Sequence, residues 1–479
     1  MYDVSQLIGG TWIADGEAGH LNVVSPADGA PVTRFPIAAE ATVAAAVKAA
    51  RDAAGEWARM PAAERGACLH RAADAVASAA EELAVAQHRE MGRTLPAARA
   101  AVAAAVATLR QYAELGPVHR GRSLAGDWNA VDFMTWEPRG VVAAITPWND
   151  PVAVSCNLLG AALAAGNTVV YKPSERTPAT GWLLTRLFAE HLPAGVLSLV
   201  TGAGGVGATL AGEQVDVVAH VGSTATGRSI AAACAHTGAK ALLENGGNDP
   251  LIVDAGVDPD WAAGQAALGT FVNSGQLCTS VERIYVHRSI AAAFVDRLVA
   301  RCRELRLEPG HDEPVEWAPL VDVRHRAQVH AQVCAAVEDG ARLLCGGEIP
   351  EGPGAFYPPT VLVDCTDDMA VLREETFGPV APVMVVESFE EALSRAARSD
   401  YGLAATVLTS SMTNAQRALR DLPVGTVKIN DVFGGAPGGA AHPRRGSGQG
   451  IGYGPELLDE MSVTKVVHIA GPGGTASGW

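Results

Sequence analysis

The stretch GVVAAITPWNDPVAVSCNLLGAALAAGNTVVYK, residues 140–172, decides the fold class. It begins with a short apolar run at 140–145, continues into a helical pattern over 151–165, and ends in a second apolar run at 168–172. Short, wholly apolar strands joined by a helix are typical of a parallel sheet that is covered on both faces. Ligands of such sheets bind at the carboxyl ends of the strands, where this stretch carries Pro-Trp-Asn-Asp at 147–150.

The same alternation extends along most of the chain. Residues 39–115 are almost entirely helix formers, with breaks near Met60 and Gly92. The glycines at 246 and 247 separate two series of alternating elements. Besides the elements in 140–172, the first series contains helix 178–191, strand 195–200, helix 206–212 and strand 217–221. The second series comprises strand 250–255, helix 260–272, strand 283–287, helices 290–305 and 325–338, strand 383–388, helix 389–397 and strand 425–430. We therefore predict an α/β fold with two doubly wound parallel-sheet domains and a cleft between them.

Length and composition restrict the class of protein. The chain has 479 residues, of which 48% are hydrophobic and 18% charged, and this predicts a globular protein with two or more packed units. The net charge of -16 argues against partners such as nucleic acid or an anionic membrane, because both need a basic surface. The eight cysteines are scattered without CxxC pairs, which predicts neither a disulfide framework nor a metal site. The N-terminus lacks the pattern of a secretion signal, so we expect a soluble cytoplasmic protein.

A cysteine stands in an unusual setting within FVNSGQLCTSVERIYVH, residues 271–287. An isolated cysteine is most often a small buried core residue. Around Cys278, however, lie Gly275, Gln276 and Thr279. A reactive thiol needs space for approach and polar surroundings that favour the thiolate, so Cys278 is a candidate nucleophile.

Two acidic positions are candidates for chemistry. Glu244 ends an apolar strand just before two glycines, where it is either a solvated strand end or a partly buried general base. Glu374 and Glu375 lead into Phe377 and a rigid Gly-Pro turn. Most paired acids are simply solvated, but one of these two could bond sugar hydroxyls while the aromatic ring covers a flat ligand.

Two glycine-rich turns each follow a strand and open a helix. GAGGVG at 202–207 satisfies the G-x-G-x-x-G pattern of a pyrophosphate-binding turn, and GSTATG at 222–227 has similarly small residues. The acid expected about 20 residues after the first pattern is missing, because Gly222 stands there. Each turn therefore predicts phosphate binding only weakly.

Taken together and in order, six motifs resemble the NAD(P)-dependent aldehyde dehydrogenase superfamily over nearly the whole chain. They are Pro147-Trp148-Asn149, Lys172-Pro173-Ser174-Glu175, Gly222-Ser223-Thr224, Glu244 with Gly246-Gly247, Gly275-Gln276-Leu277-Cys278-Thr279 and Glu375-Thr376-Phe377-Gly378-Pro379. The resemblance implies NAD-dependent oxidation of an aldehyde to its carboxylic acid. Cys278 would attack the aldehyde to give a thiohemiacetal and then a thioester, which water activated by Glu244 would hydrolyse. The Asn149 amide and the main-chain N–H of Cys278 would form the oxyanion hole.

The resemblance also implies a set of cofactor-binding residues. Glu175 would accept a bond from the ribose 2'-hydroxyl and repel a 2'-phosphate, which favours NAD, while the nearby Lys172 leaves NADP possible. The full set is Ile145, Trp148, Lys172, Glu175, Gly204, Gly222, Ser223, Glu375 and Phe377.

The chain departs from the usual family pattern at several positions. Asp150 and Asn157 stand where relatives usually carry aromatic or apolar residues, Leu158 replaces a frequent lysine, and His220 replaces a phenylalanine. Because Asp150 and Asn157 are seven residues apart, about two helical turns, both could face the aldehyde tunnel and select a small hydroxy- or amino-bearing aldehyde. Leu277 argues against a phosphorylated substrate. The alternative for Asp150 is helix capping, since proline follows it at the first helical position.

Other functions remain open from the residues. A coenzyme A-acylating semialdehyde dehydrogenase would use the same thioester but generally lacks the base at Glu244. A non-catalytic protein of the same fold would be expected to lose Cys278 or Glu244, and a cysteine hydrolase would need a histidine partner that no motif supplies.

The resemblance also implies how the chain is divided. The predicted NAD-binding domain comprises 1–119 and 139–246, the catalytic domain 247–445, and the bridging segments 120–138 and 446–479. We expect the first bridging segment and the strand SVTKVVHIA to form a β-arm that pairs across subunits, because exposed strand edges need a partner. This predicts a homodimer or homotetramer.

Overall fold

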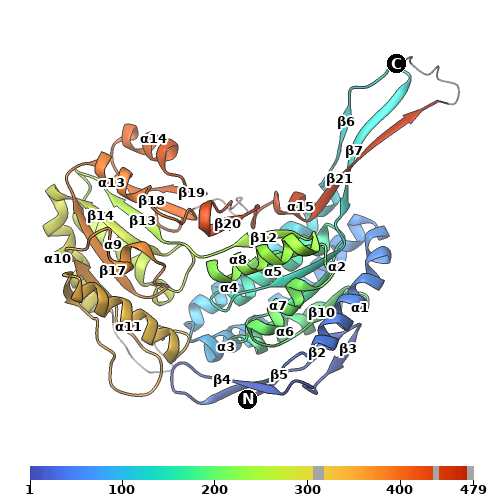
Figure 1. The fold of residues 1–479 in the computed structure, drawn as a ribbon, viewed down its shortest axis with the longest axis horizontal. Helices are drawn as coiled ribbons and strands as arrows, with labels where there is room; N and C mark the ends of the chain where they lie inside the picture. The colour runs from blue at the N-terminus through green and yellow to red at the C-terminus, as the bar shows by residue number, and fades with distance from the viewer. Residues whose placement is uncertain (306–317, 435–441, 472–479) are drawn as a thin grey trace.

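The computed structural model describes residues 1–305, 318–434 and 442–471. These residues form two α/β units, each built around one sheet, and a β-arm that projects away from them (Figure 1). The mixed α/β architecture with parallel sheets confirms the predicted fold class.

The first sheet has a reversal of strand order in its middle. Its strands, in spatial order, are β20 (Gly448–Gln449), β12 (Lys240–Glu244), β11 (Val217–Val221), β8 (Val141–Ile145), β9 (Thr168–Lys172), β10 (Leu197–Leu199), β2 (Gln6–Ile8) and β3 (Thr11–Ile13). The five strands from β8 to β12 are parallel, and β8 pairs with β9 on one side and with β11 on the other. The chain therefore winds outward in both directions from β8, and the carboxyl end of β8 is a switch point where ligands bind.

Helices cover both faces of this sheet, and the predicted helical region at 39–115 supplies four of them. The first break follows from Pro61, which has no N–H to continue a helix, and the third helix ends at Gly92 in the left-handed conformation, φ 78°. The helices packed on one face are α2 (Ala62–Ser78), α3 (Ala80–Met91), α4 (Leu95–Leu115), α5 (Pro151–Ala164) and α6 (Pro178–Ala189). On the other face lie α1 (Glu40–Arg59), α7 (Gly204–Gly212) and α8 (Thr224–Thr237).

The second sheet is also largely parallel and is packed between helices. Its strands, in spatial order, are β15 (Arg342–Cys345), β16 (Thr360–Val363), β17 (Val380–Val386), β14 (Val281–His287), β13 (Asp249–Val253), β18 (Ala404–Leu408) and β19 (Thr426–Ile429). Only β15 pairs antiparallel with its neighbour in this sheet. Its helices are α9 (Pro259–Phe271), α10 (Arg288–Glu304), α11 (Val323–Glu338), α12 (Ala370–Arg373), α13 (Phe389–Ala396) and α14 (Met412–Asp421).

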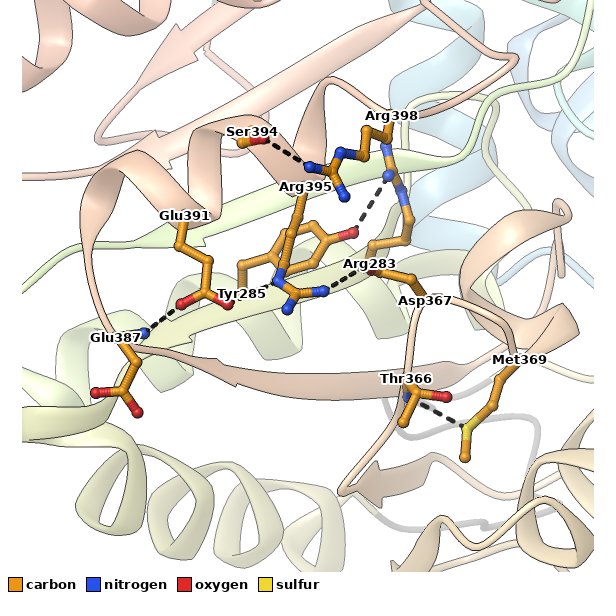
Figure 2. A network of polar contacts seen from close by, with 10 residues as sticks. All are labelled: Arg283, Tyr285, Thr366, Asp367, Met369, Glu387, Glu391, Ser394, Arg395 and Arg398. Atoms are coloured by element: carbon orange, nitrogen blue, oxygen red, sulfur yellow. Dashed lines mark hydrogen bonds and ion pairs between the residues drawn. The ribbon is translucent and has the colours of Figure 1, made fainter.

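A polar network ties α13 to the strands of the second sheet (Figure 2). Arg395 on α13 donates to Glu391 at 2.9 Å. The buried Arg283 on β14 donates to the Tyr285 hydroxyl at 3.3 Å. It also donates to the main-chain oxygen of Asn248 at 2.8 Å and to that of Ala396, the last residue of α13, at 3.3 Å. A buried guanidinium is stable only when its donors are paired, so this network holds the residue after Gly247 in a fixed position.

The β-arm is made by two segments from opposite ends of the chain. β21 (Ser462–Ala470) pairs antiparallel with β7 (Ala130–Pro138) along its whole length, and β6 (Arg122–Leu124) pairs with the other edge of β7. Two apolar residues of β21 are largely exposed, Val466 at 68% and Ile469 at 56%. The two predicted arm segments thus pair within one chain, and pairing across subunits stays a prediction.

The remaining elements are short. They comprise a small sheet of β1 (Tyr2–Asp3), β5 (Pro31–Pro36) and β4 (His20–Val24), the 3-10 turns η1 (Gly116–Val118), η2 (Val272–Gly275) and η3 (Arg445–Ser447), and the helix α15 (Leu457–Glu460). Within the described residues, no helix combines the length and the apolar character needed to span a bilayer.

Candidate active site

A cavity of about 770 Å³ lies where the two units meet. One wall comes from the carboxyl ends of the first sheet's strands, and the other from loops at the amino ends of the second sheet's strands. Nine of the predicted site residues line it: Trp148, Asn149, Asp150, Gly222, Ser223, Leu277, Cys278, Glu375 and Phe377. Residues that are far apart in the sequence therefore share one space.

The loop that carries Cys278 is held in an unusual backbone conformation. Before it, three consecutive residues have positive φ: Asn273 at 50°, Ser274 at 55° and Gly275 at 71°. A Cβ on Gly275 would lie 2.2 Å from the carbonyl oxygen of Gly378, so only glycine fits between these two turns. This left-handed turn projects the cysteine into the cavity and stores strain that the surrounding contacts must balance.

Side-chain hydrogen bonds also hold the loop that carries Cys278. The Gln276 amide donates to the carbonyl of Pro319 at 3.2 Å, and its oxygen accepts from the N–H of Val321 at 2.8 Å. The Asn149 amide donates to the main-chain oxygen of Gln276 at 3.1 Å. An amide group carries two N–H donors, so one orients Asn149 and the other is left for a substrate oxygen next to Cys278.

The electrostatic surroundings keep the Cys278 thiol protonated. Burial raises the pKa of this thiol to about 12, and the carboxylates of Glu244, Asp249 and Glu375 add to the effect. A nucleophilic thiolate therefore forms only when a base removes the proton or when positive charge enters the cavity.

Glu244 lies at the end of β12 but does not line the cavity. Its carboxylate faces Gly452, where an added Cβ would lie 2.1 Å from Oε1. Burial raises the pKa of Glu244 to about 7, and the nearby main chain of Gly452 lowers it slightly. A carboxyl whose pKa is raised in this way holds a proton more readily than a solvated one, which suits a general base.

On the opposite wall, a buried acid shapes the loop at 375–377. Glu282 accepts from the main-chain N–H groups of Thr376 and Phe377, each at 2.8 Å. These bonds hold Phe377 at a φ of 51°, and its ring packs edge-on against Trp148 with centroids 5.5 Å apart. Glu375 in turn accepts from the N–H of Gly247 at 2.9 Å. The loop thus presents one flat ring and one carboxylate to the cavity.

The helix-capping prediction for Asp150 is confirmed for its position, the N-cap of α5, and wrong only for a side-chain bond to the helix. Asp150 does occupy the position before α5, and Pro151 follows it, but its carboxylate makes no bond to the N–H groups of the helix. Instead, Oδ1 accepts from Nη1 of Arg93 at 2.7 Å. The arginine side chain is nearly buried, so the Asp150 carboxylate that lines the cavity is already paired with a positive charge.

The prediction that Asn157 faces the aldehyde tunnel is also wrong. Its side chain is buried, accepts from the Tyr112 hydroxyl at 2.9 Å and donates to the carbonyl of Gly452 at 2.8 Å. Seven residues place Asn157 on the same side of α5 as Asp150 but about 10 Å further along the axis. Of this helix, only the start reaches the cavity, through Asp150, which precedes α5, and Val154 in its first turn.

The remaining predicted cofactor residues lie along the carboxyl edge of the first sheet. Ile145 pairs in register with Lys172 on the neighbouring strand. The Lys172 ammonium is buried, donates to the carbonyl of Pro173 at 3.1 Å and lies 4.0 Å from the Glu175 carboxylate. Gly204 opens α7, and no atom would lie within 4 Å of a Cβ there.

This edge fits a dinucleotide. The hydroxyl oxygen of Thr224, in the first turn of α8, is buried and has no partner in the described part of the chain. The open space at Gly204 leaves room for a ligand to approach the main chain. Unpaired buried donors beside the start of a helix are the groups that a phosphate satisfies.

Several residues around the cavity were not predicted. Arg93 pairs with Asp150, and Arg176 lies over the Trp148 ring at 5.2 Å. His325 donates from Nε2 to the carbonyl of Phe377 at 2.7 Å. These residues come from loops and from a helix without a distinctive motif, so only the tertiary structure brings them to the site.

Comparisons with known proteins agree on one family. The sequence model described as "Aldehyde dehydrogenase family" matches residues 12–467. A betaine aldehyde dehydrogenase from Cereibacter sphaeroides is 37% identical over 429 residues, which cover 89% of each chain. The crystal structure of lactaldehyde dehydrogenase from Escherichia coli is 33% identical, with a TM-score of 0.95 over 97% of this chain and 99% of that one. A betaine aldehyde dehydrogenase variant from Staphylococcus aureus, in complex with NAD+, is 31% identical, with a TM-score of 0.95 over 98% of both chains.

Proposed function

Since the chain belongs to the aldehyde dehydrogenase family, we propose that it oxidises a small polar aldehyde to its carboxylic acid through a thioester on Cys278, with NAD as the hydride acceptor. One observation supports this most directly: Cys278 lies in the cavity between the two sheets together with Asn149, Glu375 and Phe377. The cofactor is inferred from the family, from the relative that binds NAD+, and from the fit of the first sheet's carboxyl edge to a dinucleotide.

The first step is attack of the Cys278 sulfur on the aldehyde carbon. The thiol proton passes to a base, and Glu244, with a pKa raised to about 7 by burial, is the proposed acceptor. The C=O bond becomes a C–O⁻ group, and the free N–H of the Asn149 amide donates to it. When bound, NAD would supply the acceptor for the hydride of this carbon, and Cys278 would then hold the acyl group as a thioester.

The second step is hydrolysis of the thioester. Glu244 first releases the thiol proton to solvent and then removes a proton from water. The resulting hydroxide attacks the carbonyl carbon, and the C–S bond breaks to release the acid and the thiol. Because Glu244 faces Gly452 instead of the cavity, its side chain must turn towards Cys278 for both proton transfers. The small residue at 452 leaves the space in which the carboxylate rests.

The substrate that the cavity favours is a neutral hydroxyaldehyde. Asp150 lines the cavity and offers an acceptor for a hydroxyl group. Its charge is compensated by Arg93, whose side chain is only 10% exposed, so the pair attracts a cationic aldehyde less than a lone carboxylate would. Both classes occur among the relatives, which include lactaldehyde and betaine aldehyde dehydrogenases.

We further propose that the β-arm joins two or four copies of the chain. Within the described residues, β21 pairs along one edge only, and it carries the exposed Val466 and Ile469. Such an edge is stabilised when it pairs with another strand or is covered by a partner. Light scattering of the purified chain gives its mass in solution, and a monomer at micromolar concentration would contradict this part of the proposal.

The catalytic proposal is tested by following NADH formation with a panel of aldehydes and without coenzyme A. We expect activity in the wild type and none in Cys278→Ala, while Cys334→Ala, which alters an exposed cysteine on α11, keeps it. Glu244→Gln should still produce one equivalent of NADH per active site but should turn over slowly. Activity that requires coenzyme A, or that survives Cys278→Ala, would contradict the proposal.

A further inference from the structure

His220 is a buried histidine whose ring makes no hydrogen bond in the described part of the chain. It lies on β11, is 5% exposed, and both Nδ1 and Nε2 are buried without a partner. Burial lowers the pKa of His220 to about 4, while the main chains of Ile145 and Ser223 lie close enough to oppose part of this shift. The ring is therefore neutral at physiological pH, with one N–H donor and one nitrogen acceptor. The main-chain groups of Ile145 and Ser223 lie near the ring without forming a hydrogen bond of good geometry, so a ligand that reached the two nitrogens would supply the missing bonds.

The position of His220 in the sheet points to a ligand site. In the parallel register, His220 on β11 is opposite Ile145 on β8, and Ile145 is opposite Lys172 on β9. Register partners in a parallel sheet direct their side chains to the same face, so these three residues form a row across three strands. The row crosses β8, the strand from which the sheet winds outward in both directions, and therefore marks the switch point.

Gly222 and the start of α8 border the ring of His220. A Cβ on Gly222 would lie 2.6 Å from Cε1 of His220, so a larger residue there would displace the ring. On the same side, the buried hydroxyl of Thr224 also has no partner among the described residues. Helices α7 and α8, which cover this face, both begin next to glycine-rich turns. The unpaired groups thus lie together at one edge.

We propose that His220 hydrogen-bonds the ribose–phosphate part of the adenosine half of the bound dinucleotide, an inference that rests on the proposed use of NAD. Hydroxyl and phosphate oxygens both accept from a neutral imidazole N–H, and a ribose hydroxyl also donates to its second nitrogen. Lys172 lies in the same row as His220, with Ile145 between them, and Glu175 lies 4.0 Å from Lys172, so the residues proposed for the adenosine half lie at this edge of the sheet. The side chain of His220 thus adds one polar contact to the cofactor from a strand whose other side chains are mostly apolar.

The test compares His220→Phe with the wild type by isothermal titration calorimetry of NAD and of ADP-ribose. Loss of one such bond corresponds to about a 2- to 12-fold weaker affinity. The loss should be equal for both ligands, because both contain the adenosine half. His220→Asn keeps an N–H donor and should lose less. His236→Phe, which alters an exposed histidine at the end of α8, should bind both ligands like the wild type.

A second measurement separates cofactor binding from a role in folding. In the cofactor-free protein, phenylalanine removes two unpaired buried polar atoms, so the Tm of His220→Phe should stay the same or rise. Equal NAD affinity in wild type and His220→Phe would overturn the proposal, and so would a fall in both affinity and Tm. A loss confined to NAD would overturn the assignment to the adenosine half. A wild-type protein that binds neither ligand would overturn this inference together with the proposed cofactor.

Discussion

The ion pair between Arg93 and Asp150 predicts how the charge of the substrate is selected. The two side chains are joined by a 2.7 Å bond, and they are 10% and 27% exposed. Arg93→Met keeps most of the apolar stem of the side chain but removes the cation behind the carboxylate. We expect this change to increase the preference for a cationic aldehyde over a neutral one of similar size.

The size of the effect follows from the geometry of the pair. A substrate cation in contact with Asp150 would lie about 4 Å from the carboxylate and about 7 Å from the guanidinium, and at an effective dielectric constant of about 20 the guanidinium then costs it about 2.4 kcal/mol. Because solvent in the open cavity screens the charges, we expect about 1–2 kcal/mol of this cost in the measured difference in activation free energy. Removal of Arg93 should therefore raise the ratio of kcat/KM for a cationic to a neutral aldehyde by about 5- to 30-fold.

The assay measures kcat/KM for betaine aldehyde and for lactaldehyde from initial rates of NADH formation. The wild type should prefer lactaldehyde. Arg93→Lys keeps a positive charge and should retain a ratio close to that of the wild type. The double variant Arg93→Met with Asp150→Asn removes both charges and should return the ratio towards the wild-type value.

An unchanged ratio in Arg93→Met would refute the reasoning, since it would mean that the substrate does not approach Asp150. The same conclusion would follow if Arg93→Lys and Arg93→Met changed the ratio equally. Asp150→Asn alone should weaken betaine aldehyde turnover more than lactaldehyde turnover, and the opposite order would refute the placement of the carboxylate in the substrate's path.

Three further predictions concern the base, a buried anchor and the catalytic turn. The rate of thioester hydrolysis should rise with pH and reach half its maximum near pH 7, because Glu244 must be ionised to accept a proton and burial raises its pKa to about 7. A single-turnover pH profile that is identical in Glu244→Gln would contradict this. Glu90→Ala should destabilise the fold by about 3–5 kcal/mol, because the buried carboxylate accepts four hydrogen bonds, two of them from first-turn N–H groups of α6; the check is a fall in Tm that the exposed Glu64→Ala does not share. Gly275→Ala should reduce kcat/KM at least 10-fold, since a Cβ there would lie 2.2 Å from a carbonyl oxygen and displace the nucleophile. Gly212→Ala is the control, because a Cβ there meets no atom within 4 Å. Equal activity of both variants would contradict the steric argument.

Local patterns were sufficient to predict the elements of the fold. The apolar run at 141–145 is β8, the helix expected at 151–165 is α5 (Pro151–Ala164), and the break near Gly92 is a left-handed helix end. Such patterns reflect burial on one or both faces, which neighbouring residues in the chain largely determine. The order of the motifs was likewise sufficient to identify the family, because each motif has a fixed place in the chain.

The orientation of polar side chains could not be predicted in the same way. Asp150 and Asn157 share one side of a helix, yet one lines the cavity and the other is bonded to Tyr112 and Gly452. Helical spacing gives the direction of a side chain around the axis but not the place where the helix enters a cavity. Neither does it reveal Arg93, which is 57 residues from its partner and belongs to no motif.

The sequence by itself thus determined the class of fold, the family and the residue types of the chemistry, because these depend on local periodicity and on short motifs in order. Only the tertiary structure decided which charges meet in the cavity and which polar atoms are left without a partner. The physical reason is that hydrogen bonds and ion pairs depend on distances of a few ångströms between residues far apart in the chain. The Arg93 and Asp150 pair and the unpaired ring of His220 both come from such contacts.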